Sequence, residues 1–268
     1  MNKPQISLFA SAARPKYWMR LYNSLLQNSV SFEIIFVGPN PPTFTLPENF
    51  RYYFSKCKPS QCYQAAAFEC EGELIHWTAD DADYNEPTAR CPNTLDSVWQ
   101  NYQDSIIKYG DRRTIFSMRT IEDYKDTGHA DWEKHRFFYG DMRTPQMAPL
   151  GAMNREFFNS IGGYDKGFEA GQSENDIICR ALAEGGRVET AKDAKVFLHH
   201  AECHSTYPFR KGYNNDRAFL ESCWVNEGYG TYEKRLPYTL SKIRLRPFEG
   251  FEKKDILTVN QGAVTIAW

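Results

Sequence analysis

The 268-residue sequence predicts an α/β protein with a mainly parallel central sheet flanked by helices. Short apolar runs of strand length alternate with segments whose apolar residues recur at helical spacing. Turn-forming residues such as Gly38-Pro39 separate these segments. One apolar run, Leu74 to Ala79, ends in a group of carboxylates, as expected where a buried strand leaves the sheet at its ligand-binding edge.

The first 80 residues have the order strand, helix, two strands, helix, strand, which is typical of a parallel sheet. The first helix is predicted because Trp18, Leu21 and Leu25 recur at helical spacing. Strands are expected at 5–10, 32–37, 51–54 and 74–79, and helices at 16–28 and 60–70.

The remaining chain continues the pattern around one irregular segment. Residues 120–144 are polar and aromatic without a clean period, and long irregular stretches in compact domains are usually functional or mobile. Gly162-Gly163 ends a short helix. Strands are expected at 114–119, 149–153 and 195–198, helices at 88–109, 155–161, 174–185 and 213–225, and a hairpin within 256–268 around Asn260-Gln261-Gly262.

Composition sets limits on partners and compartment. The net charge is −2 and no polybasic run occurs, so a nucleic-acid partner is not expected. A local basic groove is compatible with this net charge and stays an alternative. The seven cysteines form no CxxC pair and are interpreted as reduced thiols of a cytoplasmic protein. No signal peptide and no transmembrane segment are predicted.

The acidic cluster is the most informative feature. Asp80, Asp81 and Asp83 repel one another unless a cation lies between them, and hard oxygen ligands suit Mg²⁺ or Mn²⁺. An ion held there would also bind a diphosphate. The alternative is a plain polar turn, because Asp is common where a strand meets a loop.

A second pair of acids begins a predicted helix. Glu174 and Asp176 have a structural explanation, since carboxylates in the first turn favour the helix dipole and Asp176 can pair with Arg180. The functional alternative is that the pair is catalytic, with Glu174 facing a cleft as a general base and Asp176 beside it in the same site.

Three further features complete the candidate site. His199-His200 at a strand end can complete the shell of a divalent ion, whereas a structural zinc site lacks a second cluster. The loop from Ala10 through Ser11 and Arg14 follows the first strand, where a nucleoside could rest, but it is no GxGxxG or P-loop. In the irregular segment, aromatic residues including Trp132 could stack on sugar.

Taken together, these motifs resemble those of the family-2-like glycosyltransferases with a GT-A fold, from the first strand to about residue 225. Gly72-Glu73-Leu74-Ile75 with the DxD pattern Asp81-Ala82-Asp83 is similar to the family's donor segment. The acceptor segment is matched by residues 149–155 with Ile161-Gly162-Gly163-Tyr164-Asp165. Ser173-Glu174-Asn175-Asp176 with Arg180 resembles its "ED-x-D-(x)3-R" motif, with Glu174 in place of the catalytic Asp.

The resemblance implies a metal-dependent transfer of a sugar from a nucleotide-diphosphate sugar to an acceptor hydroxyl. It implies that Asp81, Asp83 and His200 or His199 bind Mn²⁺ or Mg²⁺, that Asp80 lies near the ribose or metal, and that Glu174 is the base. It places Gly163, Tyr164 and Asp165 on the acceptor side. The implied GT-A domain covers 1–232, with a donor half to about 119 and an acceptor half from 120, and 233–268 is a C-terminal extension.

Two other classes of protein remain open at this point. A nucleotidyltransferase would share the sheet and metal acids, but would favour a Gly-rich basic loop after the first strand. A non-catalytic carbohydrate-binding protein can use the same fold. Donor, acceptor, oligomeric state and the choice between inversion and retention are open. Where relatives often carry a base-reading acid, this chain has Gly38-Pro39-Asn40.

Overall fold

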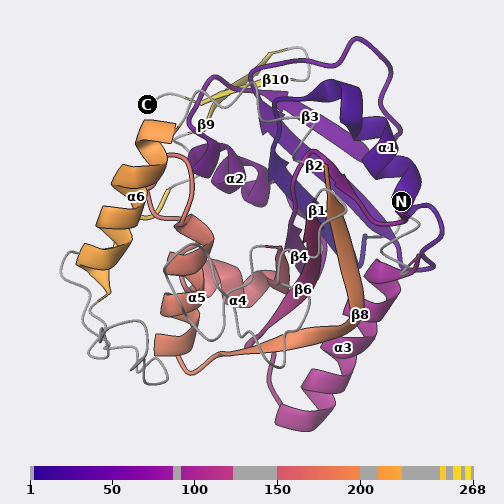
Figure 1. The fold of residues 1–268 in the computed structure, drawn as a ribbon, viewed down its shortest axis with the longest axis vertical. Helices are drawn as coiled ribbons and strands as arrows, with labels where there is room; N and C mark the ends of the chain where they lie inside the picture. The colour runs from indigo at the N-terminus through magenta and orange to yellow at the C-terminus, as the bar shows by residue number, and fades with distance from the viewer. Residues whose placement is uncertain are drawn as a thin grey trace.

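The arrangement of the chain is that of a layered α/β protein. A computed structural model describes residues 3–86, 92–122, 150–199, 210–224, 248–251, 256–260 and 263–266. Figure 1 shows a central sheet between two groups of helices. On one side lie α1 (Pro15–Leu25) and α3 (Thr94–Tyr109), and on the other lie α2 (Pro59–Phe68), α4 (Arg155–Ser160) and α5 (Ser173–Ala183). The predicted α/β class is confirmed.

The sheet is mixed, so the prediction of a mainly parallel sheet is wrong. Its strand order is β3-β2-β1-β4-β7-β6-β8-β5. The pairs β2–β3, β1–β2, β1–β4 and β6–β8 are parallel, whereas β4–β7, β6–β7 and β5–β8 are antiparallel. A short buried run such as β7 has the same apolar pattern in either direction, so its composition does not report its orientation. The strands are β1 (Ile6–Ser11), β2 (Phe32–Gly38), β3 (Phe50–Phe54), β4 (Leu74–Trp77), β5 (Ala82–Asp83), β6 (Thr114–Glu122), β7 (Gly151–Asn154) and β8 (Arg187–Leu198).

Successive side chains of the strands enter two different apolar cores, as the two-residue period of a strand requires. Leu8 of β1 packs in the core that also contains Trp18 of α1. Its neighbour Phe9 lies in the opposite core, with Ala66 of α2 and Phe158 of α4. The central strands are therefore buried on both faces, and only their ends can meet a ligand.

Several element boundaries differ from those predicted. β8 begins at Arg187, well before the predicted 195, because its first half alternates polar and apolar residues and lacks an apolar run. α3 begins at Thr94. The C-terminal hairpin of β9 (Ile256–Asn260) and β10 (Ala263–Ile266) is antiparallel, as predicted. α6 (Arg210–Cys223) packs on α5 through a small cluster around Phe168, Leu220 and Trp224.

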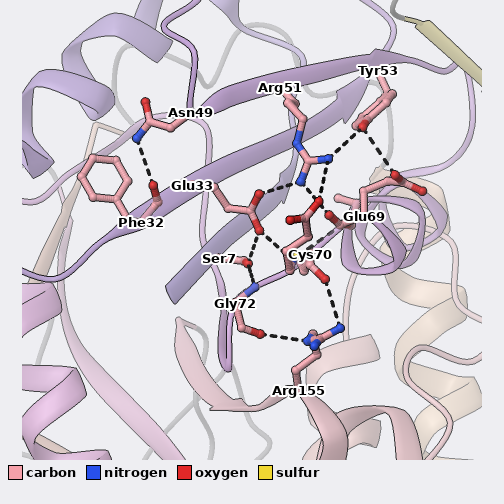
Figure 2. Close-up of polar contacts among 12 residues, drawn as sticks. Ser7, Phe32, Glu33, Asn49, Arg51, Tyr53, Glu69, Cys70, Gly72 and Arg155 are labelled. Atoms are coloured by element: carbon pink, nitrogen blue, oxygen red, sulfur yellow. Dashed lines mark hydrogen bonds and ion pairs between the residues drawn. The ribbon is translucent and has the colours of Figure 1, made fainter. Parts of the chain in front are cut away.

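A polar network ties the amino ends of the parallel strands together (Figure 2). Buried Glu33 of β2 accepts hydrogen bonds from Ser7 Oγ of β1 at 2.5 Å and from an Arg51 terminal nitrogen of β3 at 2.6 Å. Ser7 Oγ in turn accepts from Gly72 N at 2.7 Å, and Arg155 Nε donates to Gly72 O at 2.9 Å. This network closes the edge opposite the acidic cluster and fixes the register of three strands.

Two general features of the chain bear on its environment. No helix in the described ranges is long and apolar enough to cross a membrane. Five cysteines within those ranges are buried, namely Cys57, Cys62, Cys70, Cys179 and Cys223.

Candidate active site

The three aspartates lie at the carboxyl edge of the sheet. β1 and β4 run parallel and end at the same edge, and Asp80 and Asp81 follow β4 closely. Both are buried, with 2% and 0% of their surface exposed, whereas Asp83 is partly exposed in β5. This edge is where open α/β sheets bind ligands.

Asp80 anchors the loop that follows β1. Its Oδ2 accepts hydrogen bonds from the backbone nitrogens of Ala13 at 2.8 Å and Arg14 at 2.7 Å. Its Oδ1 accepts from Arg14 Nε at 2.8 Å and from a terminal guanidinium nitrogen. Asp80 therefore positions this loop through its carboxylate.

The guanidinium of Arg14 also reaches Asp81. One terminal nitrogen lies 2.9 Å from Asp81 Oδ1, and the other donates to Oδ2 at 3.2 Å. Because a buried carboxylate is costly without an opposite charge, this single cation stabilises both acids. The cation that the acidic cluster requires is thus partly supplied by the chain itself.

The end of β2 closes on the same loop. Ala12 N donates to Val37 O at 2.8 Å, and Asn40 Nδ2 donates to Ala13 O at 2.7 Å. A Cβ on Gly38 would lie 1.8 Å from the Ala12 carbonyl oxygen, so this position accepts only glycine. Close backbone contact between the end of β2 and the loop after β1 therefore explains the glycine at this position.

The remaining predicted donor residues lie at the same strand end with different exposure. Ala10 is fully buried in the core, so its side chain packs against other apolar residues. Ser11 is the last residue of β1 and is partly exposed. Of β1 and the loop that follows it, Ser11 and the loop are the parts that can present side chains at the edge.

A histidine joins the acidic cluster from β8. His199 is buried, and its Nε2 lies 3.6 Å from Asp83 Oδ2. Its backbone nitrogen donates to Asp81 O at 3.5 Å. β5 and β8 pair antiparallel, which brings Asp83 beside the end of β8. His200, the predicted metal ligand, lies outside the described residues.

The side chains of this cluster are of the types that bind a divalent ion, but they are not arranged as a metal site. Carboxylate oxygens and an imidazole nitrogen are ligands that Mn²⁺ accepts. Among the described residues, no group of three His, Cys, Asp or Glu side chains is assembled as a metal site. The Asp81 carboxylate is engaged by Arg14 instead.

Glu174 lies in the first turn of α5, as predicted, and is partly buried. Burial raises the pKa of its carboxyl, the Ser173 hydroxyl opposes this effect by donating a hydrogen bond, and the charge of Asp216 raises the pKa further. Gln172, which precedes the helix, has a left-handed backbone with φ of 62°. Such strain in a non-glycine residue is often found at functional sites.

Two tyrosines lie between the surroundings of Glu174 and the end of β4. The charge of Glu174 is among the causes that raise the pKa of buried Tyr164. The Tyr164 ring lies 5.7 Å from that of Tyr63, whose hydroxyl donates to Thr78 O at 2.7 Å. Thr78 precedes the aspartates on the strand end.

Asp176 has a different environment from Glu174. It is fully buried, and Arg180 Nε donates to its Oδ2 at 2.8 Å, which is the pairing that the spacing predicts. Trp224 Nε1 of the α6 region donates to its Oδ1 at 2.8 Å. Both oxygens of this carboxylate hold α5 in place.

The predicted acceptor residues are packed into the protein. Tyr164 and Asp165 are 1% and 0% exposed. Gly163 has φ of 68°, and a Cβ there would meet the Gln64 side chain at 2.3 Å. Asp165 accepts from Gly167 N at 2.7 Å and from Glu249 N at 3.2 Å. These contacts shape the loop, and Trp132 lies outside the described residues.

Two parts of this region were not predicted as functional from sequence. Asp216 of α6 is 1% exposed and accepts hydrogen bonds from Glu169 N at 2.9 Å, Ala170 N at 2.6 Å and Gly171 N at 2.8 Å, so it orders the loop that leads into α5. The available sequence signal was its place in the predicted helix 213–225, ahead of Phe219 and Trp224. Residues 248–251 cover the Gly162-Gly163 loop, and Arg180 lies 4.3 Å from the Phe248 ring centroid. No motif indicated this contact.

Comparison with known proteins identifies the fold. No family model matches the chain. GalNAc-T7 with UDP, GalNAc and Mn²⁺ aligns with a TM-score of 0.54 at 16% identity, over 74% of this chain and 44% of that chain. S. aureus TarS 1–349 aligns with a TM-score of 0.50 at 11% identity, over 74% and 61%.

A third similar structure is the mannosyltransferase PcManGT from Pyrobaculum calidifontis in complex with GDP-Man and Mn²⁺, with a TM-score of 0.50 at 13% identity, over 82% of this chain and 71% of that chain. The chain spans 61% of TarS 1–349 and 44% of the GalNAc-T7 chain. Identities this low report the fold alone. All three structures are GT-A glycosyltransferases, and the chain has the GT-A fold.

Proposed function

We propose that the chain is a glycosyltransferase that moves a sugar from a nucleotide-diphosphate sugar to an acceptor hydroxyl, with inversion at the anomeric carbon. One observation carries this proposal. On a GT-A sheet, the loop after β1 and the three aspartates lie at the carboxyl edge, and the segment that leads into the helix of Glu174 contacts the start of α2, which follows the carboxyl end of β3, through a hydrogen bond from Ser60 N to Glu169 O at 3.0 Å. The similarity to family-2-like enzymes supports the same assignment.

In this proposal, the chain's own residues hold the donor and move one proton. Arg14, Asp80 and Asp81 border the donor site, with Ser11 and the backbone at Ala10 at its base. The acceptor oxygen bonds to the anomeric carbon as the bond from that carbon to the diphosphate oxygen breaks. Glu174 takes the hydroxyl proton, and the nucleoside diphosphate leaves. Its raised pKa makes it a stronger base than an ordinary glutamate.

A divalent ion, Mn²⁺ or Mg²⁺, is the proposed cofactor. Asp81, Asp83 and His199 or His200 would hold it, and when bound it would neutralise charge on the leaving diphosphate. Trp132 is proposed to contact the acceptor or its sugar. Gly163, Tyr164 and Asp165 contribute by shaping the acceptor side, because their side chains are buried or absent.

The test is a measurement of the products released from UDP-, GDP-, CDP- and TDP-sugars in the presence of Mn²⁺. Release of a nucleoside diphosphate supports the transferase. Release of pyrophosphate would indicate a nucleotidyltransferase, and binding of glycan without turnover would indicate a carbohydrate-binding protein.

Glu174→Gln tests the identity of the base. We expect it to bind donor normally and to lose turnover by about 10³-fold, within the range that general-base catalysis contributes. Glu184→Gln, at the exposed end of the same helix, is the matched control and should keep full activity. Full activity in Glu174→Gln would falsify the base assignment.

A further inference from the structure

Three buried polar side chains join the two ends of the acidic turn, residues 79–83. Thr78 lies just before this turn and Tyr84 just after it, and Thr78 Oγ1 lies 2.6 Å from the Tyr84 hydroxyl. The same hydroxyl lies 2.5 Å from Nε2 of His76 in β4. All three residues have 0% of their surface exposed. Because a buried polar group is stable only when it is hydrogen-bonded, these three side chains, which we call the inner network, depend on one another.

The direction of each hydrogen bond in the inner network follows from one backbone group. His76 Nδ1 lies 2.8 Å from Gly151 O of β7, and a carbonyl oxygen can only accept, so Nδ1 carries the proton. Burial lowers the pKa of His76 to about 4, so the imidazole is neutral near pH 7 and its Nε2 can only accept. Tyr84 therefore donates to His76, and Thr78 donates to Tyr84.

We propose that the inner network positions the acidic turn, with Tyr84 as the central positioning residue. The backbone on either side of the turn is tied to neighbouring elements as well. Thr78 N donates to Phe9 O of β1 at 3.0 Å, and Tyr84 N donates to Ser24 Oγ of α1 at 3.0 Å. The bond between the two side chains closes the base of the turn between these anchors. This inference rests on the proposed function, because the acidic turn borders the proposed donor site.

The turn in turn sets the position of the loop after β1. Ala82 N donates to Ala79 O at 3.1 Å within the turn. Asp80 then accepts hydrogen bonds from the backbone nitrogens of Ala13 at 2.8 Å and Arg14 at 2.7 Å. A shift of the turn would therefore also move the loop that borders the donor site. Tyr84 acts on donor binding through these contacts, because its own side chain is fully buried.

The hydroxyl of Tyr84 has no substitute within the inner network. Tyr84→Phe removes the donor to His76 Nε2 and the acceptor of the Thr78 hydroxyl. His76 cannot compensate by changing its tautomer, because Gly151 O needs the proton on Nδ1. A buried polar group that loses its partner costs more than an ordinary hydrogen bond contributes, so we expect the turn to open more often in this variant.

The test makes two measurements on the full chain. By hydrogen exchange, the backbone amides of residues 79–84 should exchange about tenfold faster in Tyr84→Phe than in the wild type, as for a local opening. By steady-state kinetics with UDP-, GDP-, CDP- and TDP-sugars and Mn²⁺, KM for the donor that is used should rise about tenfold. That is the lower end of the range for groups that orient ligand-binding side chains, and kcat should change less.

Tyr102→Phe is the matched control. Tyr102 is 1% exposed, and its hydroxyl donates to Glu73 Oε1 at 2.8 Å and accepts from Asn154 Nδ2 at 2.9 Å, at the amino end of β4. Its loss should lower the melting temperature but leave donor KM and the exchange of residues 79–84 relative to the rest of the chain unchanged.

Thr78→Val is a milder variant for the case that Tyr84→Phe does not fold. It removes one hydroxyl and keeps the bond from Tyr84 to His76, so it should give the same two effects to a smaller degree. In the Tyr84→Phe background it should add little, because residues of one hydrogen-bond network are not additive.

The proposal is overturned if residues 79–84 exchange no faster in Tyr84→Phe and Thr78→Val than in Tyr102→Phe, or if donor KM rises equally in all three variants. These results are separate from the fate of the proposed function. If the wild type releases nucleoside diphosphate and Tyr84→Phe behaves as Tyr102→Phe does, only this inference fails. If the wild type uses no donor but the turn exchanges faster in Tyr84→Phe, the positioning role stands and the proposed function fails.

Discussion

Glu174 and Asp176 lie close together on α5, yet their surroundings differ. Asp176 is fully buried, with Arg180 and Trp224 on its two oxygens. Glu174 is partly exposed, and burial, opposed by Ser173, raises the pKa of its carboxyl. A base must reach its substrate, whereas a positioning carboxylate must not move. We therefore propose Glu174 as the base and Asp176 as a structural residue, and two measurements distinguish these roles.

Glu174→Gln should stabilise the protein at alkaline pH. The folded pKa of Glu174 is raised above the ordinary value of 4.5, so the ionised carboxylate is less favourable in the folded state than in the unfolded chain. That penalty is fully present above the folded pKa and disappears as pH falls below 4.5. We expect a higher melting temperature for the variant at pH 8 and none of this gain at pH 4. A melting temperature equal to that of wild type at both pH values would contradict the pKa shift.

Asp176→Asn should act mainly on stability. The substitution keeps the shape of the side chain but leaves the buried Arg180 guanidinium without its carboxylate. Breaking a buried ion pair costs about 3 kcal/mol, and urea denaturation measures it. The folded fraction should keep measurable turnover. Loss of all turnover with unchanged stability would show instead that Asp176 acts in the chemical step.

How far the sequence predicts individual residues depends on whether their partners are local. The Asp176–Arg180 pair follows from helical spacing and is confirmed. The contact between Arg14 and the aspartates joins residues separated by |i−j| of 66 and 67, and no local pattern reports it. The hydrogen bonds of Asp80 to the loop after β1 were missed for the same reason, and its place near a ribose or metal stays a prediction.

At the scale of elements, α6 controls the entry to α5. Its Asp216 gathers three backbone N–H groups of the preceding loop, and Trp224 bonds to Asp176. In the sequence, Glu174 lies between the loop bound by Asp216 and the Asp176 bound by Trp224. Contacts from α6 therefore fix the position of Glu174, the proposed base. The repulsion between Asp216 and Glu174 adds to the raised pKa of Glu174.

Asp216→Asn tests this coupling of α6 to α5. An amide cannot accept all of the loop's N–H groups, so kcat should fall by about tenfold, as expected when a positioning contact is lost, with a small change in KM for donor. Loss of the negative charge lowers the pKa of Glu174, so the acidic limb of the pH–rate profile should move to lower pH. Ser173, through its hydrogen bond, and Asp216, through its charge, both influence the pKa of Glu174. An unshifted limb would limit Asp216 to a purely structural role.

At the scale of the whole molecule, a stabilising polar network lies at one edge of the sheet and the proposed ligand site lies at the other. The network of Ser7, Glu33, Arg51 and Gly72 closes the amino ends of the parallel strands, as Figure 2 shows. Arg14 and the aspartates lie at the opposite ends of β1 and β4. Stabilising and functional polar groups are thus kept apart by the length of the strands.

Local sequence patterns predict the fold to the level of class and strand position, and the resemblance of the motifs adds the GT-A fold, which is confirmed. Buried runs, helical spacing and turn residues placed most elements, because these signals are local. The direction of β7 and the full length of β8 were not predicted. Strand direction depends on distant partners, and the first half of β8 is half-exposed. The packing of residues 248–251 on the Gly162-Gly163 loop is a long-range contact of the same kind.

The most direct test of the account is a thermal-shift panel of UDP-, GDP-, CDP- and TDP-sugars, each with and without Mn²⁺, on the wild type and on Asp83→Ala. A ligand of the native state at 100 times its Kd stabilises it by about 2.7 kcal/mol. We predict a rise in melting temperature for one nucleotide class that requires Mn²⁺ and is absent in Asp83→Ala. No rise with any donor, or an equal rise in Asp83→Ala, would contradict a donor site at the acidic edge.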